Sequence, residues 1–144
     1  MKKIIYTFVF LLLANFSLAA MTGDSGSKDS SSNQENLYKA AKQLIVKAKK
    51  LEKKDKLEKA LKLYSKAYDK LMKAYGKDKK NPDILNYLGF TLRKAGNFEE
   101  AEKFYLEGLE IKPDHEGINE YLGELYVKTN RIELAKERLE VLKG

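Results

Sequence analysis

The side chains that could carry out chemistry are few in this sequence, and their spacing does not bring them together. His115 is the only histidine, and there is no cysteine. A Cys–His nucleophile pair and a cluster of histidine and cysteine metal ligands are therefore both excluded. His115 lies between Asp114 and Glu116 in a predicted turn, where we expect an exposed side chain.

Other catalytic patterns are missing as well. Most serines gather near the N-terminus, far in sequence from His115, and no glycine-rich phosphate loop is present. Glu99, Glu100 and Glu102 form an acidic group, but acids at the start of a helix stabilise the positive end of its dipole. We therefore predict no catalytic residue, no metal site and no cofactor, and we expect a protein that is not an enzyme.

The charge of the chain is divided unevenly. Residues 37–80 hold sixteen lysines and five acids, whereas residues 81–144 hold nine basic residues and thirteen acids. The lysines are either a solvated helix surface, a surface for an anionic partner such as lipid head groups, or one half of a head-to-tail contact between copies. Nucleic acid is disfavoured, because Arg93, Arg131 and Arg138 are the only arginines.

The elements that must position these side chains are helices. From Leu37 onward, apolar residues recur at steps of three and four, and breaks fall at 53–56, 76–82, 95–98, 112–117 and 129–132. These breaks predict an all-α fold of six helices in three antiparallel hairpins. The segment Ile84–Gly89 recurs as Ile118–Gly123, a period of 34 residues that is typical of stacked helical repeats.

The first unit is longer than the others. Ala60 and Ala101 are 41 residues apart, whereas Ala101 and Ala135 are 34 apart. The additional residues predict a longer second helix in the first unit, with a protruding end near residues 73–80.

These residues resemble the tetratricopeptide repeat, which implies a right-handed α-solenoid over residues 37–144, with repeats at about 41–80, 82–115 and 116–144. The middle repeat fits best, with Leu88, Gly89, Leu92, Ala101, Tyr105, Gly108 and Pro113. The last repeat fits with Leu122, Gly123, Tyr126 and Ala135, although Leu139 and Leu142 replace the usual aromatic and small residues. The first repeat fits with Ala48, Leu51, Ala60, Tyr64 and Ala67, although Lys47 replaces the usual leucine.

A small residue and an alanine stand twelve apart in each unit, as Ala48 and Ala60, Gly89 and Ala101, or Gly123 and Ala135. We expect each hairpin to pack tightly at this pair. Tyr64, Tyr105 and Leu139 should then reach into the next layer, where a large side chain buries much apolar area.

The resemblance also implies a concave groove that binds another protein or a peptide, as an adaptor or scaffold does. The family's groove positions correspond to Lys42, Lys49, Asn86, Phe90, Arg93, Lys94, Glu120, Glu124 and Lys128. The lysine and asparagine clamp that some members use for a C-terminal carboxylate is incomplete, because Ile45 and Lys49 replace two of its residues. Phe90 is either exposed in the groove or covers its own hairpin.

The N-terminus has the pattern of an export signal. A positive start, an apolar run from Ile4 to Leu13 and small residues at Ser17 and Ala19 predict a signal peptide at residues 1–19, cleaved before Ala20. We expect an exported bacterial protein, periplasmic or secreted; the alternative is an uncleaved membrane anchor. Residues 20–36 are rich in serine, glycine and other polar residues, which predicts a flexible tether.

The last apolar layer has no predicted cap after Gly144. We expect Leu125, Leu134, Leu139 and Leu142 to leave apolar area open, for self-association or for a partner. Two functions follow: an interaction module that binds peptide or protein in the groove, or an envelope protein whose Lys-rich first hairpin docks on anionic head groups.

Overall fold

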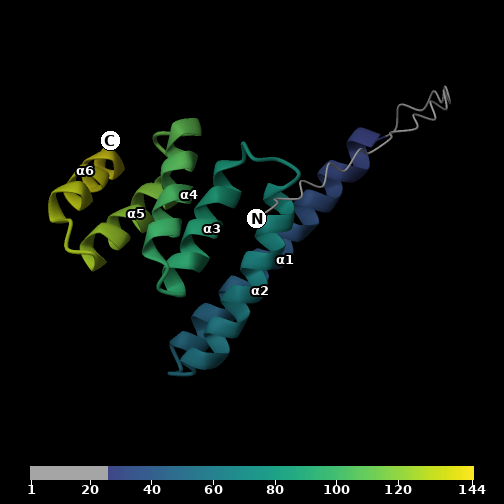
Figure 1. Cartoon of the computed structure of the whole chain (residues 1–144), viewed down its shortest axis with the longest axis horizontal. Coiled ribbons are helices and arrows are strands. Elements are labelled where there is room, and N and C mark those ends of the chain that lie inside the picture. Colours follow the sequence, from purple (N-terminus) through teal and green to yellow (C-terminus); the bar gives the residue numbers. More distant parts are fainter. Residues whose placement is uncertain (1–25) are drawn as a thin grey trace, which may run out of the picture.

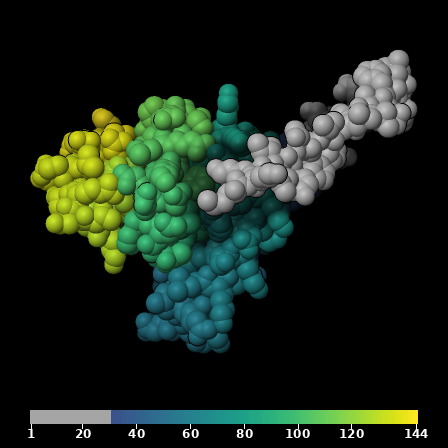
Figure 2. Space-filling model, viewed as in Figure 1, coloured from purple at the N-terminus to yellow at the C-terminus, as the bar shows by residue number. Residues whose placement is uncertain are grey.

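The computed structural model describes residues 26–144, which form six α-helices and their connections (Figure 1). The helices are α1 (Gly26–Glu52), α2 (Leu57–Tyr75), α3 (Pro82–Lys94), α4 (Phe98–Ile111), α5 (Glu116–Lys128) and α6 (Ile132–Lys143). The pairs α1 and α2, α3 and α4, and α5 and α6 pack most closely, which confirms the predicted three hairpins. In the space-filling view the green second hairpin lies between the teal first hairpin and the yellow third hairpin (Figure 2). The predicted signal peptide lies outside the described residues.

The turn inside each hairpin is closed by one residue in the left-handed backbone region. Asp55, Gly96 and Asn130 have φ angles of 54°, 84° and 60° and lie at corresponding places in the three units. Glycine adopts this region without strain, and aspartate and asparagine tolerate it better than most residues. The repeat pattern thus sets the turn geometry as well as the helix packing.

The starts of α3 and α4 are fixed by asparagine caps. The side-chain oxygen of Asn81 accepts hydrogen bonds from the backbone N–H groups of Asp83 and Ile84, and Pro82 occupies the first turn. The side-chain oxygen of Asn97 accepts the backbone N–H of Glu100 in the same way. These local signals explain why the predicted breaks lie close to the observed ones.

Helix α1 begins at Gly26, whereas the tether was expected to extend over residues 20–36. The polar residues before Leu37 continue the helix, and an ion pair between Lys39 and Glu35 spans one helical turn within this region. Figure 1 shows the purple start of α1 reaching away from the other helices. The part of the expected tether before residue 26 lies outside the described residues.

The longer second helix of the first hairpin is confirmed, because α2 has 19 residues and α4 has 14. The predicted protruding end near residues 73–80 is wrong for the last residues of the helix, although residues 76–80, which follow it, are exposed. Ala74 is fully buried, and the Tyr75 hydroxyl donates a hydrogen bond to the Glu107 carboxylate at 2.8 Å. The Tyr75 ring also meets Phe104 edge-on, with 5.8 Å between centroids. The second hairpin covers the end of α2.

Two clusters of buried side chains hold the hairpins together. The first joins α1 and α2 to α3 and includes Tyr64, Leu71, Ile84, Leu88 and Phe90. The second joins the second and third hairpins and includes Ala101, Tyr105, Ile118, Leu122 and Leu125. Because each cluster takes residues from two hairpins, no hairpin buries its apolar face alone. Within residues 26–144, no helix combines the length and the apolar character needed to cross a membrane.

A close approach is present at Gly89 of the second hairpin, where the neighbour is Tyr105, but not at Gly123 of the third. A Cβ atom on Gly89 would lie 2.5 Å from the Tyr105 ring, so only glycine fits there. A Cβ atom on Gly123 would meet only Arg138, at 3.6 Å, which is an ordinary contact. The third hairpin is therefore less tightly packed than its sequence pattern predicts.

The third hairpin leaves apolar side chains exposed, but not all of those that were predicted. Leu125 is fully buried, so its predicted exposure is wrong, because α5 contacts α3 and α4 as well as α6. Leu134, Leu139 and Leu142 on α6 are 36%, 50% and 40% exposed. Leu139 therefore does not fill a buried layer as Tyr105 does.

Candidate functional site

The first helices of the three hairpins share a face that carries aromatic and cationic side chains. We call this set the aromatic-cationic row and define it by residues of α1, α3 and α5: Tyr38, Lys42, Lys49, Tyr87, Phe90, Arg93, Lys94 and Tyr121. The helical repeat places residues of each first helix on this face at steps of three and four. Residues far apart in sequence are thus joined by side-chain contacts.

The aromatic rings of the row contact one another in sequence. The distance between ring centroids is 5.9 Å from Tyr38 to Tyr87, 6.5 Å from Tyr87 to Phe90, and 4.9 Å from Phe90 to Tyr121. These distances and the tilted orientations are those that aromatic pairs prefer. The three tyrosines are half-buried and so remain accessible to a ligand.

Phe90 is buried between hairpins, because only 1% of it is exposed and its ring contacts the first and the third hairpin. Its ring meets the Tyr64 ring edge-on at 5.6 Å, and Tyr87 and Tyr121 lie on other sides. The interpretation of Phe90 as an exposed groove residue is therefore wrong. It supports the tyrosines and does not itself present a surface.

Lys42 and Lys49 lie over aromatic rings of the row, as Lys94 also does. The Lys42 ammonium is 5.3 Å from the Tyr38 ring centroid and 5.8 Å from that of Tyr87. The Lys49 ammonium is 4.7 Å from the Phe90 centroid and donates a hydrogen bond to the Tyr121 hydroxyl at 3.2 Å. Such cation–π contacts hold an ammonium in place without neutralising it. In the described part of the chain, neither lysine forms an ion pair with a carboxylate.

The other two cations of the row are paired. Arg93 contacts the Glu124 carboxylate at 2.5 Å, and Lys94 contacts that of Glu52 at 2.8 Å. The Tyr64 hydroxyl also donates a hydrogen bond to Glu52 at 2.7 Å. Burial by itself raises the pKa of Glu52, but the hydrogen bonds and positive charges around it bring the pKa below its usual value. Glu52 is therefore ionised and neutralises Lys94.

The structure brings most of the predicted groove residues together. Lys42, Lys49, Arg93, Lys94 and Glu124 all belong to the row or bind to it. Lys128 lines a hollow next to the row with Glu52, Arg93 and Lys94.

Two predicted groove residues lie elsewhere. Asn86 is 5% exposed, and its side-chain amide lies against Gly117. Glu120 lines a separate groove between α5 and α6. Most of the predicted groove residues therefore lie together, whereas Asn86 and Glu120 lie apart from them.

Three tyrosines of the row, Tyr38, Tyr87 and Tyr121, were missed by sequence reasoning. Tyr87 and Tyr121 stand at the same position of two repeats, each directly before the Leu-Gly pair. The recurrence of an aromatic residue at this position in two repeats was the signal in the sequence that could have identified them. Tyr38 lies before the first repeat and had no such signal.

His115 is buried, with 9% of the residue exposed, so the prediction of an exposed turn residue is wrong. Its Nδ1 accepts the backbone N–H of Ile118 at 3.2 Å and caps α5. A neutral ring then carries its proton on Nε2, which faces the Asp83 carboxylate at 3.2 Å. His115 thus links α5 to α3. No group of three metal-binding side chains occurs in residues 26–144.

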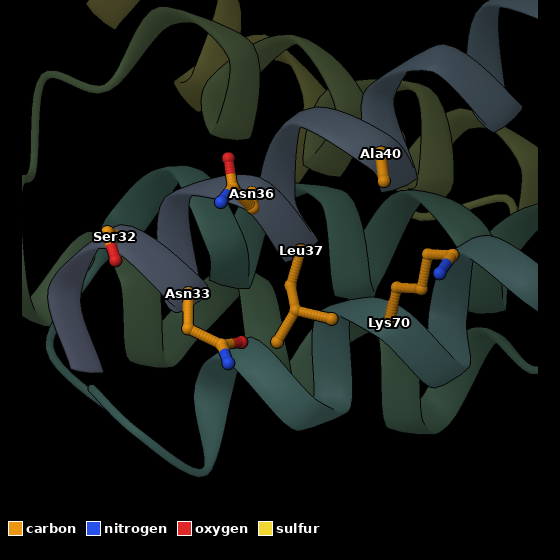
Figure 3. Close-up of a pocket in the computed structure, with 6 residues that line it drawn as sticks. All are labelled: Ser32, Asn33, Asn36, Leu37, Ala40 and Lys70. Carbon is orange, nitrogen blue, oxygen red and sulfur yellow. The ribbon is translucent and has the colours of Figure 1, made fainter. Parts of the chain in front are cut away.

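A second hollow lies between the start of α1 and the middle of α2 (Figure 3). Helix α1 supplies Ser32, Asn33, Asn36, Leu37 and Ala40, and α2 supplies Lys70. These side chains carry a hydroxyl, two amides, two aliphatic groups and one ammonium. The polar groups among them can form hydrogen bonds.

Comparisons with known proteins agree with this architecture. Residues 50–114 and residues 92–143 match two models described as tetratricopeptide repeat. The chain is 31% identical over 77 residues to the protein O-mannosyl-transferase TMTC3 of Homo sapiens. That match covers 54% of this chain and 8% of the human protein, so the chain spans less than a tenth of the relative's length.

Solved structures of low sequence identity are also similar. The second TPR of Spaghetti (RPAP3) bound to the HSP90 peptide SRMEEVD matches with a TM-score of 0.46 at 18% identity, over 77% of this chain and 95% of that one. The first TPR of the same protein, bound to the same peptide, matches with a TM-score of 0.49 at 19% identity, over 73% and 80% of the two chains.

Proposed function

The chain belongs to the tetratricopeptide repeat family, and from this we propose that it is a non-enzymatic interaction module that binds an acidic peptide segment of another protein. The binding surface is the aromatic-cationic row on α1, α3 and α5. Such a module works as an adaptor or scaffold, because it holds a partner without changing it.

One observation supports this proposal above the others: the row contains two ordered cations without carboxylate partners among the described residues. Lys42 and Lys49 are held over aromatic rings, whereas Arg93 and Lys94 are already neutralised by Glu124 and Glu52. A ligand carboxylate would gain a charge-assisted hydrogen bond from either lysine. The exposed faces of the tyrosines would pack against apolar parts of the same peptide.

A peptide-display selection on the full chain tests the proposal. We expect the selected peptides to be enriched in aspartate and glutamate. The double variant Lys42→Ala, Lys49→Ala should then bind them more weakly, because each lost charged hydrogen bond is worth about 1.5 to 3 kcal/mol, or about tenfold to a hundredfold in Kd. The matched control is Lys59→Ala, Lys66→Ala, which removes two exposed lysines of α2. Peptides that bind both double variants equally well would contradict the proposal.

We propose further that the protein is exported and acts in a bacterial periplasm or cell envelope. The support is the sequence pattern of residues 1–19. N-terminal sequencing of the protein recovered from cells that express the full chain should find Ala20 first. An intact Met1 in the membrane fraction would indicate an anchor, and an intact Met1 in the cytosol would contradict export.

The second candidate function is docking of the first hairpin on anionic membranes. The observation in its favour is that most lysines of α1 and α2 are exposed, including Lys47, Lys50, Lys59 and Lys66. Attraction to anionic lipid is worth about 1 kcal/mol per lysine near the surface and weakens with salt. Co-sedimentation with phosphatidylglycerol vesicles at low salt, lost at high salt, supports this function. Its absence at low salt eliminates it.

A further inference from the structure

The third hairpin carries an apolar groove between α5 and α6 that lies apart from the aromatic-cationic row. Four large apolar side chains and two small ones line it: Val127, Ile132, Leu139, Leu142, Gly123 and Ala135. The four large residues are 59%, 43%, 50% and 40% exposed, in that order. A contiguous exposed apolar surface of this kind is characteristic of an interaction site.

The second hairpin shows what covers the equivalent groove. Gly123, Ala135 and Leu142 each lie 34 residues after Gly89, Ala101 and Gly108, which belong to α3 and α4. Helix α5 packs against both α3 and α4. The surface that is open on the third hairpin is thus covered, on the second, by one amphipathic helix.

The side chains at the two grooves differ in size. In the second hairpin, the Ile118 side chain of α5 lies so close to Gly108 that no Cβ atom fits between them. In the third hairpin, Leu142 stands in place of Gly108. A helix that covers the open groove therefore needs a small residue where α5 has Ile118.

The charges differ as well. Glu102 in the second hairpin accepts two hydrogen bonds from Arg131, at 2.8 and 2.7 Å, directly after α5. Lys136 stands in place of Glu102 in the third hairpin. Among residues 26–144 its one ion pair is with Glu133 on its own helix, and both side chains are exposed. A helix over the open groove therefore needs an acidic residue where this chain has Arg131.

A second copy of this chain, stacked head to tail, does not meet these requirements. Lys56 precedes α2 as Arg131 precedes α6, so stacking would place Lys56 beside Lys136. Gln43 would take the place of Ile118, and the neighbouring Lys47 and Lys50 are exposed lysines that would face an apolar surface.

From these differences in size and charge, we propose that the α5–α6 groove binds one amphipathic helix of a partner protein. That helix carries a small residue opposite Leu142 and is followed by an acidic residue opposite Lys136. The α5–α6 groove lies apart from the aromatic-cationic row, so the protein could bind two partners at once.

A pair of synthetic peptides tests this proposal. The probe has the sequence of residues 114–131 of this chain with two changes, Ile118→Ala and Arg131→Glu; the control peptide has the unchanged sequence. Titration into the isotope-labelled full chain, followed by amide NMR shifts, should show changes confined to α5 and α6. We expect the control peptide to bind more weakly, by about tenfold or more. Its isoleucine is too large opposite Leu142, and its arginine has the same charge as Lys136.

A groove variant makes the test specific. Leu139→Glu places a charge in the groove, at a half-exposed site, and should abolish the shifts while the circular dichroism spectrum stays unchanged. If that variant unfolds, Val127→Glu serves instead, because Val127 is still more exposed. Equal binding of the two peptides, or shifts on α1 and α3, would overturn the proposal. So would a dimer of the chain in light scattering that Leu139→Glu dissociates, because the occupant would then be a second copy.

Discussion

The second and third hairpins are built on the same 34-residue pattern, yet their equivalent side chains lie in different surroundings. Tyr105 is fully buried, whereas Leu139, at the same position of the next repeat, is 50% exposed. Gly89 lies directly under the Tyr105 ring, whereas Gly123 has room for a methyl group. The second hairpin has a neighbour on each side, and this accounts for the difference. In a repeat protein the role of a position depends on the adjacent layer as much as on the pattern.

The largest expected difference between the two hairpins concerns Tyr105 and Leu139. Tyr105→Ala should destabilise the fold by about 3 to 5 kcal/mol, the usual cost of deleting a buried aromatic side chain. Leu139→Ala removes a half-exposed side chain and should cost less than about 1 kcal/mol. Urea unfolding followed by circular dichroism measures both. A similar loss for the two variants would mean that Leu139 is covered in solution.

The two equivalent glycines should respond to alanine in opposite directions. Gly89→Ala forces a Cβ atom against the buried Tyr105 ring, and overpacking of this kind costs about 1 to 3 kcal/mol. Gly123→Ala meets no such obstacle and should stabilise α5 by up to about 1 kcal/mol, the difference in helix propensity between the two residues. The measurement is the shift in the urea midpoint. If Gly123→Ala also destabilises the protein, the groove is narrower than the structure indicates.

The sequence could predict those parts of the fold that depend on local signals. The breaks between helices follow from Asn81 with Pro82, and from Gly96 with Asn97, because caps and left-handed turns involve residues within one turn of each other. The same holds for the longer α2. The start of α1 was less predictable, because polar residues can continue a helix as readily as they form a coil.

The burial of particular side chains could not be predicted, because it depends on other hairpins. Phe90 is covered by Tyr64 and Tyr121, which come from the hairpins on either side. His115 is buried because it reaches Asp83 in the preceding unit. The candidate site could be predicted only in part for the same reason. The family pattern identifies the lysines of the row, whereas the role of the tyrosines beside them depends on how the first helices of neighbouring hairpins pack.

A moderate effect is expected at the ion pair between Glu102 and Arg131. The hydrogen bonds from Arg131 hold the pKa of Glu102 below its usual range, more than offsetting the opposite effect of burial. A carboxylate with a lowered pKa stabilises the fold at pH values above its unfolded pKa of about 4.3, and this stabilisation is lost as the pH falls through the lower folded value. Because both side chains of this pair are partly exposed, Glu102→Gln should cost about 1 kcal/mol at pH 7.

The pH dependence supplies the control for that variant. The difference in free energy of unfolding between the wild type and Glu102→Gln should shrink as the pH falls below about 4.3. In that range Glu102 of the wild type is protonated first in the unfolded state and, at lower pH, in the folded state as well. A difference that stays constant with pH would show that the variant acts through packing, not through the charge of Glu102.

The smallest effect is expected at Lys136, the counterpart of Glu102 in the third hairpin. Its one ion pair within the described part of the chain is with Glu133, three residues earlier on the same helix, and both side chains are largely exposed. Such pairs contribute about 0.2 to 0.5 kcal/mol, so Lys136→Gln should leave the urea midpoint nearly unchanged at pH 7. Glu102→Gln, measured in parallel, shows the cost of removing a charge whose ion-pair partner comes from the neighbouring hairpin. A cost at Lys136 as large as that at Glu102 would mean that something already covers the third hairpin, and the contrast between the two hairpins would fail. A near-zero cost leaves Lys136 available to pair with an acidic residue of a partner helix.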